Sequence, residues 1–560
     1  MMVDPRIVET YNVGKEGFIV ALSEALGVPA LIDQCLTSPT GRPLEIPYGV
    51  LAMMMMVNMC DDHRPVYKLN EYYEYRDLEG LFHYPISLEQ INDDRFGGFL
   101  DLFHAANCRN IFTQIAAKAI TLYGIRIKNI NFDTTSKVMW GNYETEEGVL
   151  GVIKIDFGHS KDKRNDKKQI KYGIGCANGI IVDAIVLSGN KDDKKYNLDT
   201  LETIDTTLTN LKVNKEDFYY IADSALFTKD NLDVASKKEI KLITRMPDNV
   251  LEAKAAINEA VNILKELKIV TIQNAKGELL TYKQLEKTCE YNGHSLKLAV
   301  CYSESLKTTK EKSVAKTVIK ESEGISKVAK TLAKREFACE EDALREIEKL
   351  KLKDFKKVTY HDISFQVKSQ EKRKSGRPSK DRDGNIKSYR YYLEIHSESN
   401  ANKIHRAVEE NCCFVLCSNE LNISTEELLR EYKTQDSVEK KFKQLKSPQF
   451  VNAIYLESPE RIEAFSYLML ICMLMLSIAE HVVRRGLAQD NDQIIGPGKV
   501  KMKKPTQRAI YDIFYSVRIR VVYHPDKPWE CSFAYPLRES LQKILKYLQI
   551  PENTFIKGSG

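Results

Sequence analysis

Three acidic side chains that lie far apart in the sequence have the type and placement to act together. Asp133 closes a short apolar run at 130–133, and Asp223 directly follows another at 218–222; both runs are typical of buried strands. The third acid, Glu439, lies on a predicted helix that follows a further strand. In α/β sheets, binding and catalytic residues lie at the carboxyl ends of the strands, so this order of elements predicts that the three acids form one carboxylate cluster.

A carboxylate cluster of this kind suits a hard cation. Mg²⁺ takes oxygen ligands, keeps several of its waters, and binds through a few carboxylates together with substrate phosphate. Two such ions about 4 Å apart can activate an attacking oxygen on one side of a phosphodiester and stabilise the leaving oxygen on the other. With two ions in place, the protein need not supply a dedicated base.

The predicted helix at 431–448 carries a polar stripe beside an apolar face. At about 100° per residue, several polar side chains fall within an arc of roughly 60°, with Lys443 close beside them: Tyr432, Gln435, Glu439 and Lys446. Such a helix could rest on a core and present an acid to a phosphate backbone. Taken alone, a Glu439–Lys443 pair at i,i+4 is more typical of a solvated helix face, and the upstream acids change that balance.

The sequence around these acids predicts a mixture of strands and helices. Two apolar runs, 172–177 and 180–187, predict a hairpin that turns at Asn178-Gly179, and 198–211 predicts a helix. A further apolar run at 412–417 predicts another buried strand, ahead of the helix that carries Glu439. A hairpin, a helix and buried strands in this order predict an α/β fold.

A chain of 560 residues is too long for one core, so we expect several structural units. Helical spacing dominates both ends of the chain, whereas strands and lysine-rich helices alternate in its middle. We divide it into a helical N-terminal region that is a candidate for binding DNA ends (1–124), a first catalytic segment (125–246), a basic insertion of strands and helices (247–410), a second catalytic segment (411–480) and a helical C-terminal region that is a candidate for dimerisation (481–560).

The insertion contains a strongly basic segment. Residues 371–382 hold six basic and two acidic residues around the sequence KSGRPSK. Gly376-Arg377-Pro378 resembles the core of a hook that lays an extended Arg along a narrow minor groove, which makes Lys374 and Arg377 candidate DNA contacts. A mobile basic loop is the alternative interpretation.

Composition limits the classes of protein to which the chain could belong. With 43% hydrophobic and 29% charged residues it is typical of a soluble protein, and the excess of five basic residues is too small to show nucleic-acid binding. The twelve cysteines lack a Cys-x-x-Cys pair, which favours reduced thiols in a cytosolic protein over a zinc site; Cys60 and His63 have no second pair. The most apolar run, 464–479, is shorter than a membrane span, so we expect a buried helix and no membrane partner.

Three sequence blocks together resemble the DDE transposases of bacterial insertion sequences. They are Asn131-Phe132-Asp133-Thr134-Thr135, Tyr220-Ile221-Ala222-Asp223-Ser224-Ala225, and Tyr432-x2-Gln435-x3-Glu439-x6-Lys446. More narrowly, they are similar to the group with a Tyr-x2-Arg-x3-Glu-x6-Lys signature and an insertion between the second Asp and the Glu. The resemblance covers roughly 125–476, with further matches in GHSKDKR (158–164), the Ser188-Gly189-Asn190 turn before Asp192, and ITRMP (243–247).

The resemblance implies an RNase H-like catalytic domain, interrupted by the insertion, in which Asp133, Asp223 and Glu439 ligate two Mg²⁺ ions, with Mn²⁺ as a substitute. The enzyme would hydrolyse double-stranded DNA at the terminal inverted repeats of a transposon, and the freed 3′-hydroxyls would attack target DNA. The polar stripe would contact DNA near the cut through Tyr432, Gln435, Lys443 and Lys446. Transposases of this kind act as homodimers on paired ends, in the bacterial cytoplasm and at the nucleoid.

The sequence departs from the family pattern at Gln435, where the signature has Arg. A neutral amide can hydrogen-bond a phosphate but contributes no charge, so this contact would be weaker. Some family members stack a flipped base on a Trp of the insertion. The only tryptophans here are Trp140 and Trp529, so such stacking would have to come from another ring.

Two other functions remain open at this point. One is a metal-dependent nuclease of the same fold that cuts strands without joining them, and the other is a catalytically silent DNA-binding relative. Each acid also has a bland interpretation: Asp133 as a turn residue, Asp223 as a helix cap and Glu439 as half of a surface ion pair. The joint occurrence of the acids with the signature spacing favours the transposase, as does a length that accommodates end recognition, synapsis and insertion.

Overall fold

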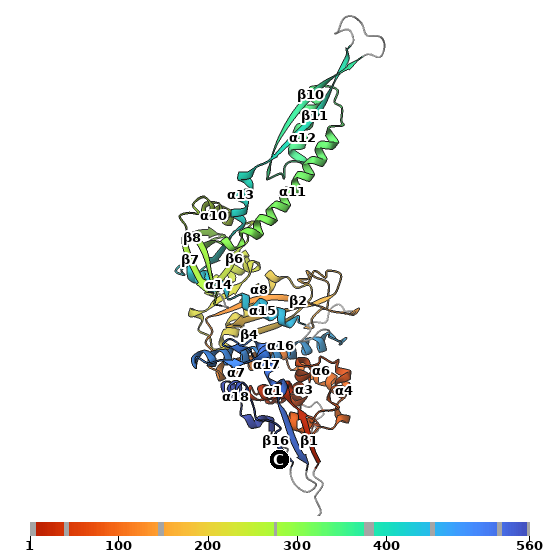
Figure 1. Cartoon of the computed structure of the whole chain (residues 1–560), viewed down its shortest axis with the longest axis vertical. Coiled ribbons are helices and arrows are strands. Elements are labelled where there is room, and N and C mark those ends of the chain that lie inside the picture. The colour runs from red at the N-terminus through yellow and green to blue at the C-terminus, as the bar shows by residue number, and fades with distance from the viewer. Residues whose placement is uncertain are drawn as a thin grey trace, which may run out of the picture. The chain divides into compact units, whose positions relative to one another are not determined.

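The computed structural model describes residues 7–37, 44–143, 151–273, 277–373, 386–447, 454–523 and 529–556. The chain forms two compact units (Figure 1). The first comprises Met1–Thr244, Ser418–Glu420 and Arg430–Gly560, and the second comprises Arg245–Cys417 and Leu421–Leu429. The chain therefore leaves the first unit after Thr244, builds most of the second, and returns to complete the first.

The first unit is built on a mixed sheet with the strand order β4-β3-β2-β5-β6. Strands β2, β3 and β4 pair antiparallel, whereas β5 pairs parallel with both β2 and β6. Their bounds are Asn129–Val138 (β2), Gln169–Ala177 (β3), Ile180–Ser188 (β4), Tyr219–Ala222 (β5) and Lys241–Met246 (β6). The predicted hairpin is confirmed: β3 turns into β4 at Asn178 and Gly179, whose φ angles of 53° and 77° suit a two-residue hairpin turn.

Helices cover both faces of this sheet, which explains why its strands are buried almost throughout. On one face, α8 (Asp193–Asn210) receives a hydrogen bond from the Tyr220 hydroxyl to Asn197 at 3.0 Å, and it packs beside α9 (Lys229–Lys237). On the other face, α16 (Pro459–Gln489) places the Ser466 hydroxyl 3.1 Å from that of Tyr172.

The strand that carries Asp133 is longer than predicted. We expected it to end at Asp133, but β2 continues to Val138 because β3 pairs with it all the way to Val138↔Gln169. What does end beside Asp133 is the parallel pairing with β5, whose last partners are Phe132 and Ala222. Asp133 therefore stands at the end of a ladder rather than at the end of a strand.

The N-terminal part of the first unit is largely helical, as predicted, and several of its helices pack against α16. Its principal helices are α1 (Gly14–Ala25), α2 (Val28–Cys35), α3 (Tyr48–Cys60), α4 (Leu69–Tyr73), α5 (Leu78–Phe82), α6 (Asp93–Ala105) and α7 (Cys108–Leu122). By length and composition α16 could cross a membrane, as could α1 and α2 if that bent pair formed one span, but 89% of the most apolar window of α16 is buried in the protein. Such burial is typical of the core helix of a large domain.

The two ends of the chain are less purely helical than we expected. Besides α17 (Gln507–Ile513) and α18 (Glu539–Leu548), the C-terminal region contains β13 (Ile494–Ile495), β14 (Lys501–Met502), β15 (Arg518–Tyr523) and β16 (Glu530–Phe533). Strand β15 pairs with β16 and with β1 (Ile7–Asn12) from the opposite end of the chain. A partner some 500 residues away leaves no local signal, and the sequence of β15 shows only a short alternation of basic and apolar residues from Arg518 to Val521.

The second unit contains four neighbouring strands of a nine-stranded sheet and an arm with a separate core. These strands run in the order β12-β9-β8-β7, and β8 and β9 form a hairpin that turns at Asn292-Gly293. The arm packs helices against an antiparallel two-stranded ribbon, β10–β11. The bounds are α10 (Leu251–Asn262), β7 (Lys268–Gln273), β8 (Leu279–Tyr291), β9 (His294–Tyr302), α11 (Lys307–Leu332), α12 (Glu340–Lys353), β10 (His361–Arg373), β11 (Ile386–Ser399), α13 (Ala401–Asn411) and β12 (Cys413–Ser418).

Candidate active site

Asp133 and Asp223 lie side by side where the parallel pairing of β2 with β5 ends. The last register pair of β2 and β5 is Phe132↔Ala222, so the next residue on each strand is an aspartate, on backbones about 4.8 Å apart. The Phe132 and Tyr220 rings stack at 4.4 Å on the α8 side of the sheet. Because side chains alternate along a strand, both carboxylates point to the opposite side.

The two aspartates are electrostatically coupled. Burial raises the pKa of Asp133, and the neighbouring Asp223 raises it further, while Lys161 acts in the opposite direction. The Asp223 carboxylate also accepts a hydrogen bond from the Ala225 amide at 2.9 Å, at the start of the short helix η4 (Ser224–Leu226). Asp223 is therefore a helix cap as well as half of the pair. The Thr244 hydroxyl donates to its carbonyl at 2.6 Å and fixes the backbone there.

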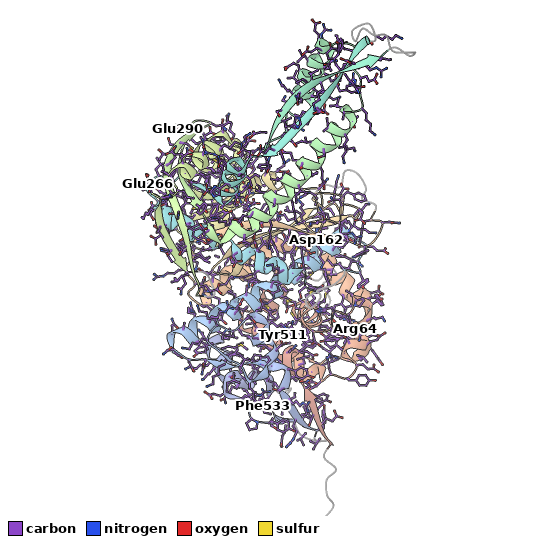
Figure 2. All side chains as sticks on the ribbon, turned by 45° about the horizontal axis from the view of Figure 1, so that its top comes forward. Arg64, Asp162, Glu266, Glu290, Tyr511 and Phe533 are labelled. Atoms are coloured by element: carbon purple, nitrogen blue, oxygen red, sulfur yellow. The ribbon has the colours of Figure 1, made fainter. Side chains whose placement is uncertain are left out.

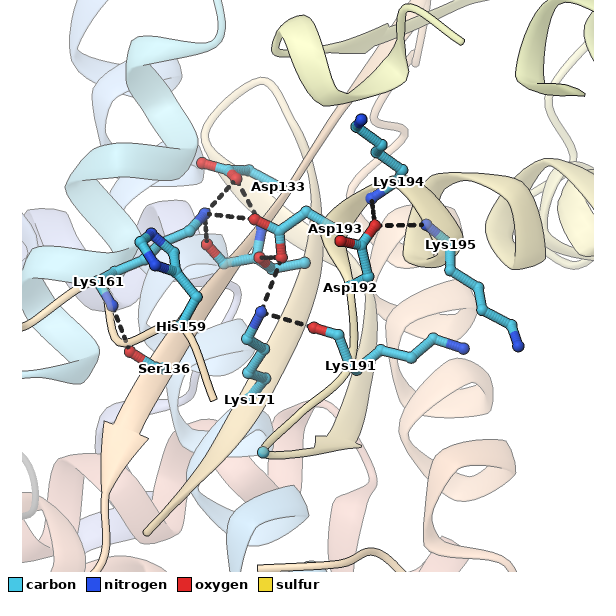
Figure 3. Close-up of polar contacts among 12 residues, drawn as sticks. Asp133, Ser136, His159, Lys161, Lys171, Lys191, Asp192, Asp193, Lys194 and Lys195 are labelled. Carbon is cyan, nitrogen blue, oxygen red and sulfur yellow. Dashed lines mark hydrogen bonds and ion pairs between the residues drawn. The ribbon is translucent and has the colours of Figure 1, made fainter. Parts of the chain in front are cut away.

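Lys161 supplies a positive charge between the acids of this site (Figure 3). Its Nζ lies 3.0 Å from Oδ1 of Asp133 and 3.6 Å from Oδ2 of Asp193, and it also donates to the Thr134 carbonyl. Burial opposes the charged form of Lys161, but Asp133 and Asp193 outweigh burial and raise its pKa. The ammonium group thus stands where a cation would offset the paired acids.

A second lysine holds Asp193 in place from the other side. The buried Lys171 donates to Asp193 at 3.0 Å and to the Lys191 carbonyl at 2.6 Å (Figure 3). The Thr134 hydroxyl adds a hydrogen bond to Asp193 at 2.7 Å. Burial alone would raise the pKa of Asp193, but Lys161, Thr134 and Lys171 together lower it. Alternating charges therefore run from Asp133 through Lys161 and Asp193 to Lys171 and fix each side chain.

The loop that carries Lys161 is anchored by close backbone approaches. A Cβ on Gly158 would lie 2.2 Å from the Gly189 carbonyl oxygen, and a Cβ on Gly189 would lie 2.5 Å from the Asp156 carbonyl oxygen. The loop can therefore pack on the Ser188-Gly189-Asn190 turn only because Gly158 and Gly189 have no side chain. The buried Gln169 amide bridges them by donating to Gly189 at 2.8 Å. The Lys161 amide itself donates to Ser136 Oγ on β2 at 3.0 Å.

The predicted single helix at 431–448 is wrong: the structure has two helices with a joint between them. Helix α14 spans Thr425–Lys433 and α15 spans Asp436–Leu445, whereas 448 lies outside the described residues. At the joint, backbone hydrogen bonds follow the tighter i→i−3 pattern, as from the Gln435 amide to the Tyr432 carbonyl. The Thr434 hydroxyl explains the joint, because it donates to the Glu431 carbonyl at 2.7 Å and also contacts Asn131 on β2 at 3.0 Å.

Helix α15, which carries Glu439, runs along β2. At its start, Thr434 bonds to Asn131. Just past its end, Lys446 pairs at 2.6 Å with Asp162, which is labelled in Figure 2, next to Lys137 on β2. The exposed Glu439 lies between these anchors, along the interval of β2 that includes Asp133. Across the ranges that the structure describes, no group of three or more His, Cys, Asp or Glu lies close enough to hold a metal. That Glu439 joins the two aspartates stays a prediction.

The other predicted DNA contacts have different surroundings. Lys446 is engaged by Asp162, Lys443 is exposed, and Tyr432 and Gln435 are half-buried. No polar group of the described residues lies within hydrogen-bond reach of Oε1 of Gln435. Lys374 and Arg377 lie outside the described residues. The role of all six in binding DNA stays a prediction.

The residues present fit a divalent cation. Two carboxylates stand side by side where the β2–β5 pairing ends, and the nearest cation to Asp133 is a lysine ammonium that a metal could replace. Like charges this close favour a proton, a lysine or a metal between them. Oxygen ligands of this kind are those that Mg²⁺ and Mn²⁺ prefer.

Lys137 is a further basic group of this site that the sequence did not single out. It is buried on β2 four residues after Asp133. Burial lowers its pKa to about 8, and the neighbouring Lys446 lowers it further, while Asp162 opposes the shift. Lys161, Lys171 and Asp193 were also missed as a network, although Lys161 belongs to the GHSKDKR match and Asp193 directly follows Asp192. Their pairing depends on three separate loops and strands, which spacing in the sequence does not show.

Comparisons with known proteins give limited information. Residues 8–117 match the family model described as "Domain of unknown function (DUF4277)". No curated protein matches the chain. Among solved structures, the chain is similar to a piggyBac transposase synaptic complex with hairpin DNA, at 10% identity and a TM-score of 0.37, over 89% of this chain and 80% of that one. It is also similar to a Mos1 transposase paired-end complex with the left transposon end, at 9% identity and a TM-score of 0.15, over 37% of this chain and 61% of that one. Both TM-scores are too low to establish a shared fold.

Proposed function

We propose that this protein is a DDE transposase of the bacterial insertion-sequence type, which cuts DNA at transposon ends and joins the freed 3′-hydroxyls to target DNA. The observation that carries the proposal is the pair of aspartates that directly follow the last register pair of β2 and β5, with the Lys161 ammonium against one of them. The mixed sheet, with its antiparallel hairpin on one side of β2 and parallel strands on the other, supports an RNase H-like catalytic domain interrupted by the second unit.

Asp133, Asp223 and Glu439 are the residues that would hold two Mg²⁺ ions, or Mn²⁺ in their place. Bound metal would supply the Lewis acid that activates water or a 3′-hydroxyl and stabilises the leaving oxygen. The strand-end register holds the two aspartates at fixed spacing, and α15 carries the glutamate. Lys161 would turn from Asp133 toward phosphate when the site fills, since its charge is then no longer needed at the carboxylate.

The polar edge of α14 and α15 is the surface we assign to DNA phosphate. Tyr432, Gln435, Lys443 and Lys446 lie along it, and Lys446 would exchange Asp162 for a phosphate oxygen. Gln435 would donate a neutral hydrogen bond where the family signature places a charged one. Double-stranded DNA, action as a homodimer on paired ends and a place at the bacterial nucleoid belong to the same proposal.

The test is Mg²⁺-dependent cleavage of DNA that carries the terminal repeats flanking the coding sequence. Asp133→Ala, Asp223→Ala and Glu439→Ala are each expected to abolish cleavage and to leave DNA binding largely intact, because the three acids act as one unit. Cleavage at the native rate by any one of these variants would refute the assignment. A nuclease of the same fold is the alternative, and it would cut the ends without producing joined strand-transfer products.

A further inference from the structure

The β10–β11 ribbon of the second unit has two unlike faces. One face packs on α11 and α12 (Figure 1), where Val367 and Leu393, paired in register, meet a core that includes Leu332 and Ile347. Alternation along each strand sends the neighbouring residues to the other face. On β10 that outer face is exposed throughout, from Asp362 to Lys372.

The outer face changes in character along the ribbon. Toward residues 374–385, each register pair includes a Lys or an Arg: Lys368↔Tyr392, Gln370↔Arg390 and Lys372↔Ser388. Toward the other end they are acidic or neutral: Asp362↔Glu398, Ser364↔His396 and Gln366↔Glu394. The half of the outer face nearer residues 374–385, which we call the distal half, therefore presents positive charge together with hydrogen-bonding side chains.

The half of the ribbon nearer residues 374–385 carries an excess of basic residues. Within 366–373 and 386–394 there are five Lys and Arg, namely Lys368, Lys372, Arg373, Lys387 and Arg390, against two acids, Glu371 and Glu394. A polyanion would be attracted to this part of the ribbon.

The ion pairs on the outer face do not prevent a polyanion from binding there. Lys368 lies 2.6 Å from Glu394, and Arg390 pairs with Glu336. All four side chains are at least one-third exposed, so water and salt weaken both pairs and a phosphate can replace either carboxylate.

The shape and side chains of this face fit the major groove of B-form DNA. That groove is about 12 Å wide and admits a two-stranded ribbon, whose strands lie about 4.8 Å apart. Arg and Lys bond guanine, Gln bonds adenine, and lysines at the margin contact phosphates. We propose that the distal outer face of the β10–β11 ribbon inserts into the major groove of duplex DNA, with Gln370 and Arg390 facing base edges and Lys368 and Lys372 facing the backbone. The inference rests on the proposed function for the identity of the polymer.

Binding of full-length protein to a random-sequence duplex of about 30 base pairs, followed by fluorescence anisotropy over a salt series, tests the electrostatic part. The double variant Lys368→Ala/Lys372→Ala is expected to bind more weakly and to reduce the log–log salt slope by about two, since each lost phosphate contact contributes about 0.9. The matched control, Arg345→Ala/Lys349→Ala, removes two exposed cations from α12 and should keep the native slope. A native slope in the Lys368/Lys372 variant would overturn the proposal.

Methylation interference on the same duplex tests the groove. A methyl group at guanine N7 lies in the major groove and one at adenine N3 lies in the minor groove. We expect methylation of guanine N7 to interfere with binding of the native protein, and we expect Arg390→Ala to weaken binding about tenfold and to remove that interference. Interference confined to adenine N3 would contradict insertion into the major groove, and displacement by polyglutamate as efficient as by DNA would point to an acidic protein instead.

The outcome for the ribbon is separable from that for the active site. If the ribbon variants bind as described but no Mg²⁺-dependent cleavage occurs with the native protein, the transposase assignment fails and the DNA-binding surface stands. If the native protein cleaves end DNA and the ribbon variants bind like the native protein, the ribbon inference fails alone.

Discussion

Lys161→Met should destabilise the protein without metal and strengthen its binding of metal. In the native protein, the Lys161 ammonium lies 3.0 Å from Asp133, whose carboxylate is coupled to that of Asp223. The variant keeps much of the side-chain volume but leaves the two aspartates without their neighbouring cation. An ion pair of this length contributes about 5 kcal/mol of attraction at an effective dielectric constant of about 20.

Desolvation of both groups offsets much of that attraction. Exposed pairs contribute up to about 1 kcal/mol, and breaking a fully buried pair costs about 3–5 kcal/mol. The side chains of Lys161 and Asp133 are 29% and 18% exposed, so the pair lies between these limits. We expect the variant to lose about 1–3 kcal/mol in the free energy of unfolding without metal.

The same change should improve the binding of metal, because Mn²⁺ or Mg²⁺ no longer competes with an internal ammonium. Each 1.4 kcal/mol of lost competition corresponds to about a tenfold lower Kd. Urea denaturation in chelator and at several Mn²⁺ concentrations measures both effects, since metal that binds only the folded state stabilises it as the ratio of concentration to Kd rises.

Lys194→Met provides the matched control, because Lys194 is an exposed lysine near the same loop (Figure 3). It should leave both the metal-free stability and the Mn²⁺ response unchanged. If Lys161→Met unfolds at the native urea concentration in chelator, or if Mn²⁺ stabilises it no more than the native protein, the account of Lys161 as the resident cation of the site is wrong.

Three further outcomes follow from the same geometry. Gln435→Arg should tighten DNA binding and steepen the log–log salt slope by about one, because it adds a charge at the phosphate edge; an unchanged slope in anisotropy titrations counts against that role. Thr434→Val removes the hydroxyl that joins the helix pair to Asn131, so it should cost about 1–2 kcal/mol in urea unfolding and slow cleavage more than it weakens binding, and native-like cleavage would refute a positioning role. Because the pKa of Asp133 is raised on folding, the folded metal-free protein holds this proton more tightly than the unfolded chain, so its contribution to stability is present at low pH and is lost as pH rises through the raised pKa. Asp133→Asn should flatten that part of the stability–pH curve measured in chelator, and an unchanged curve would exclude Asp133 as its source.

The sequence predicted the local features of the site, but it did not predict how they come together. Asn178-Gly179 between two apolar runs was enough to predict the β3–β4 hairpin, because the turn chemistry is local. The apolar runs ahead of Asp133 and Asp223 likewise predicted strands that lie in the core. That these strands are parallel neighbours in matched register depends on long-range pairing, which no spacing in the sequence encodes.

The features that the sequence did not predict also depend on contacts between distant segments. Helical periodicity continues across Thr434, so the sequence predicts one helix, and only the tertiary contact with Asn131 explains why α14 and α15 are separated. Lys161 looks like one charge among several in a polar loop, and its position depends on two glycine contacts and on β2. Strand β1 pairs with β15 at the other end of the chain, so neither sequence segment identifies its partner.

The most direct test of the account is whether Glu439 completes a metal site with Asp133 and Asp223. Electron paramagnetic resonance of Mn²⁺ added to the full-length protein, with duplex DNA carrying the terminal repeats, counts bound ions independently of cleavage. We expect two bound Mn²⁺ in the native complex, loss of at least one in Glu439→Gln, and severe loss of binding in Asp133→Asn. Native stoichiometry and affinity in Glu439→Gln would contradict the assignment of this glutamate to the site.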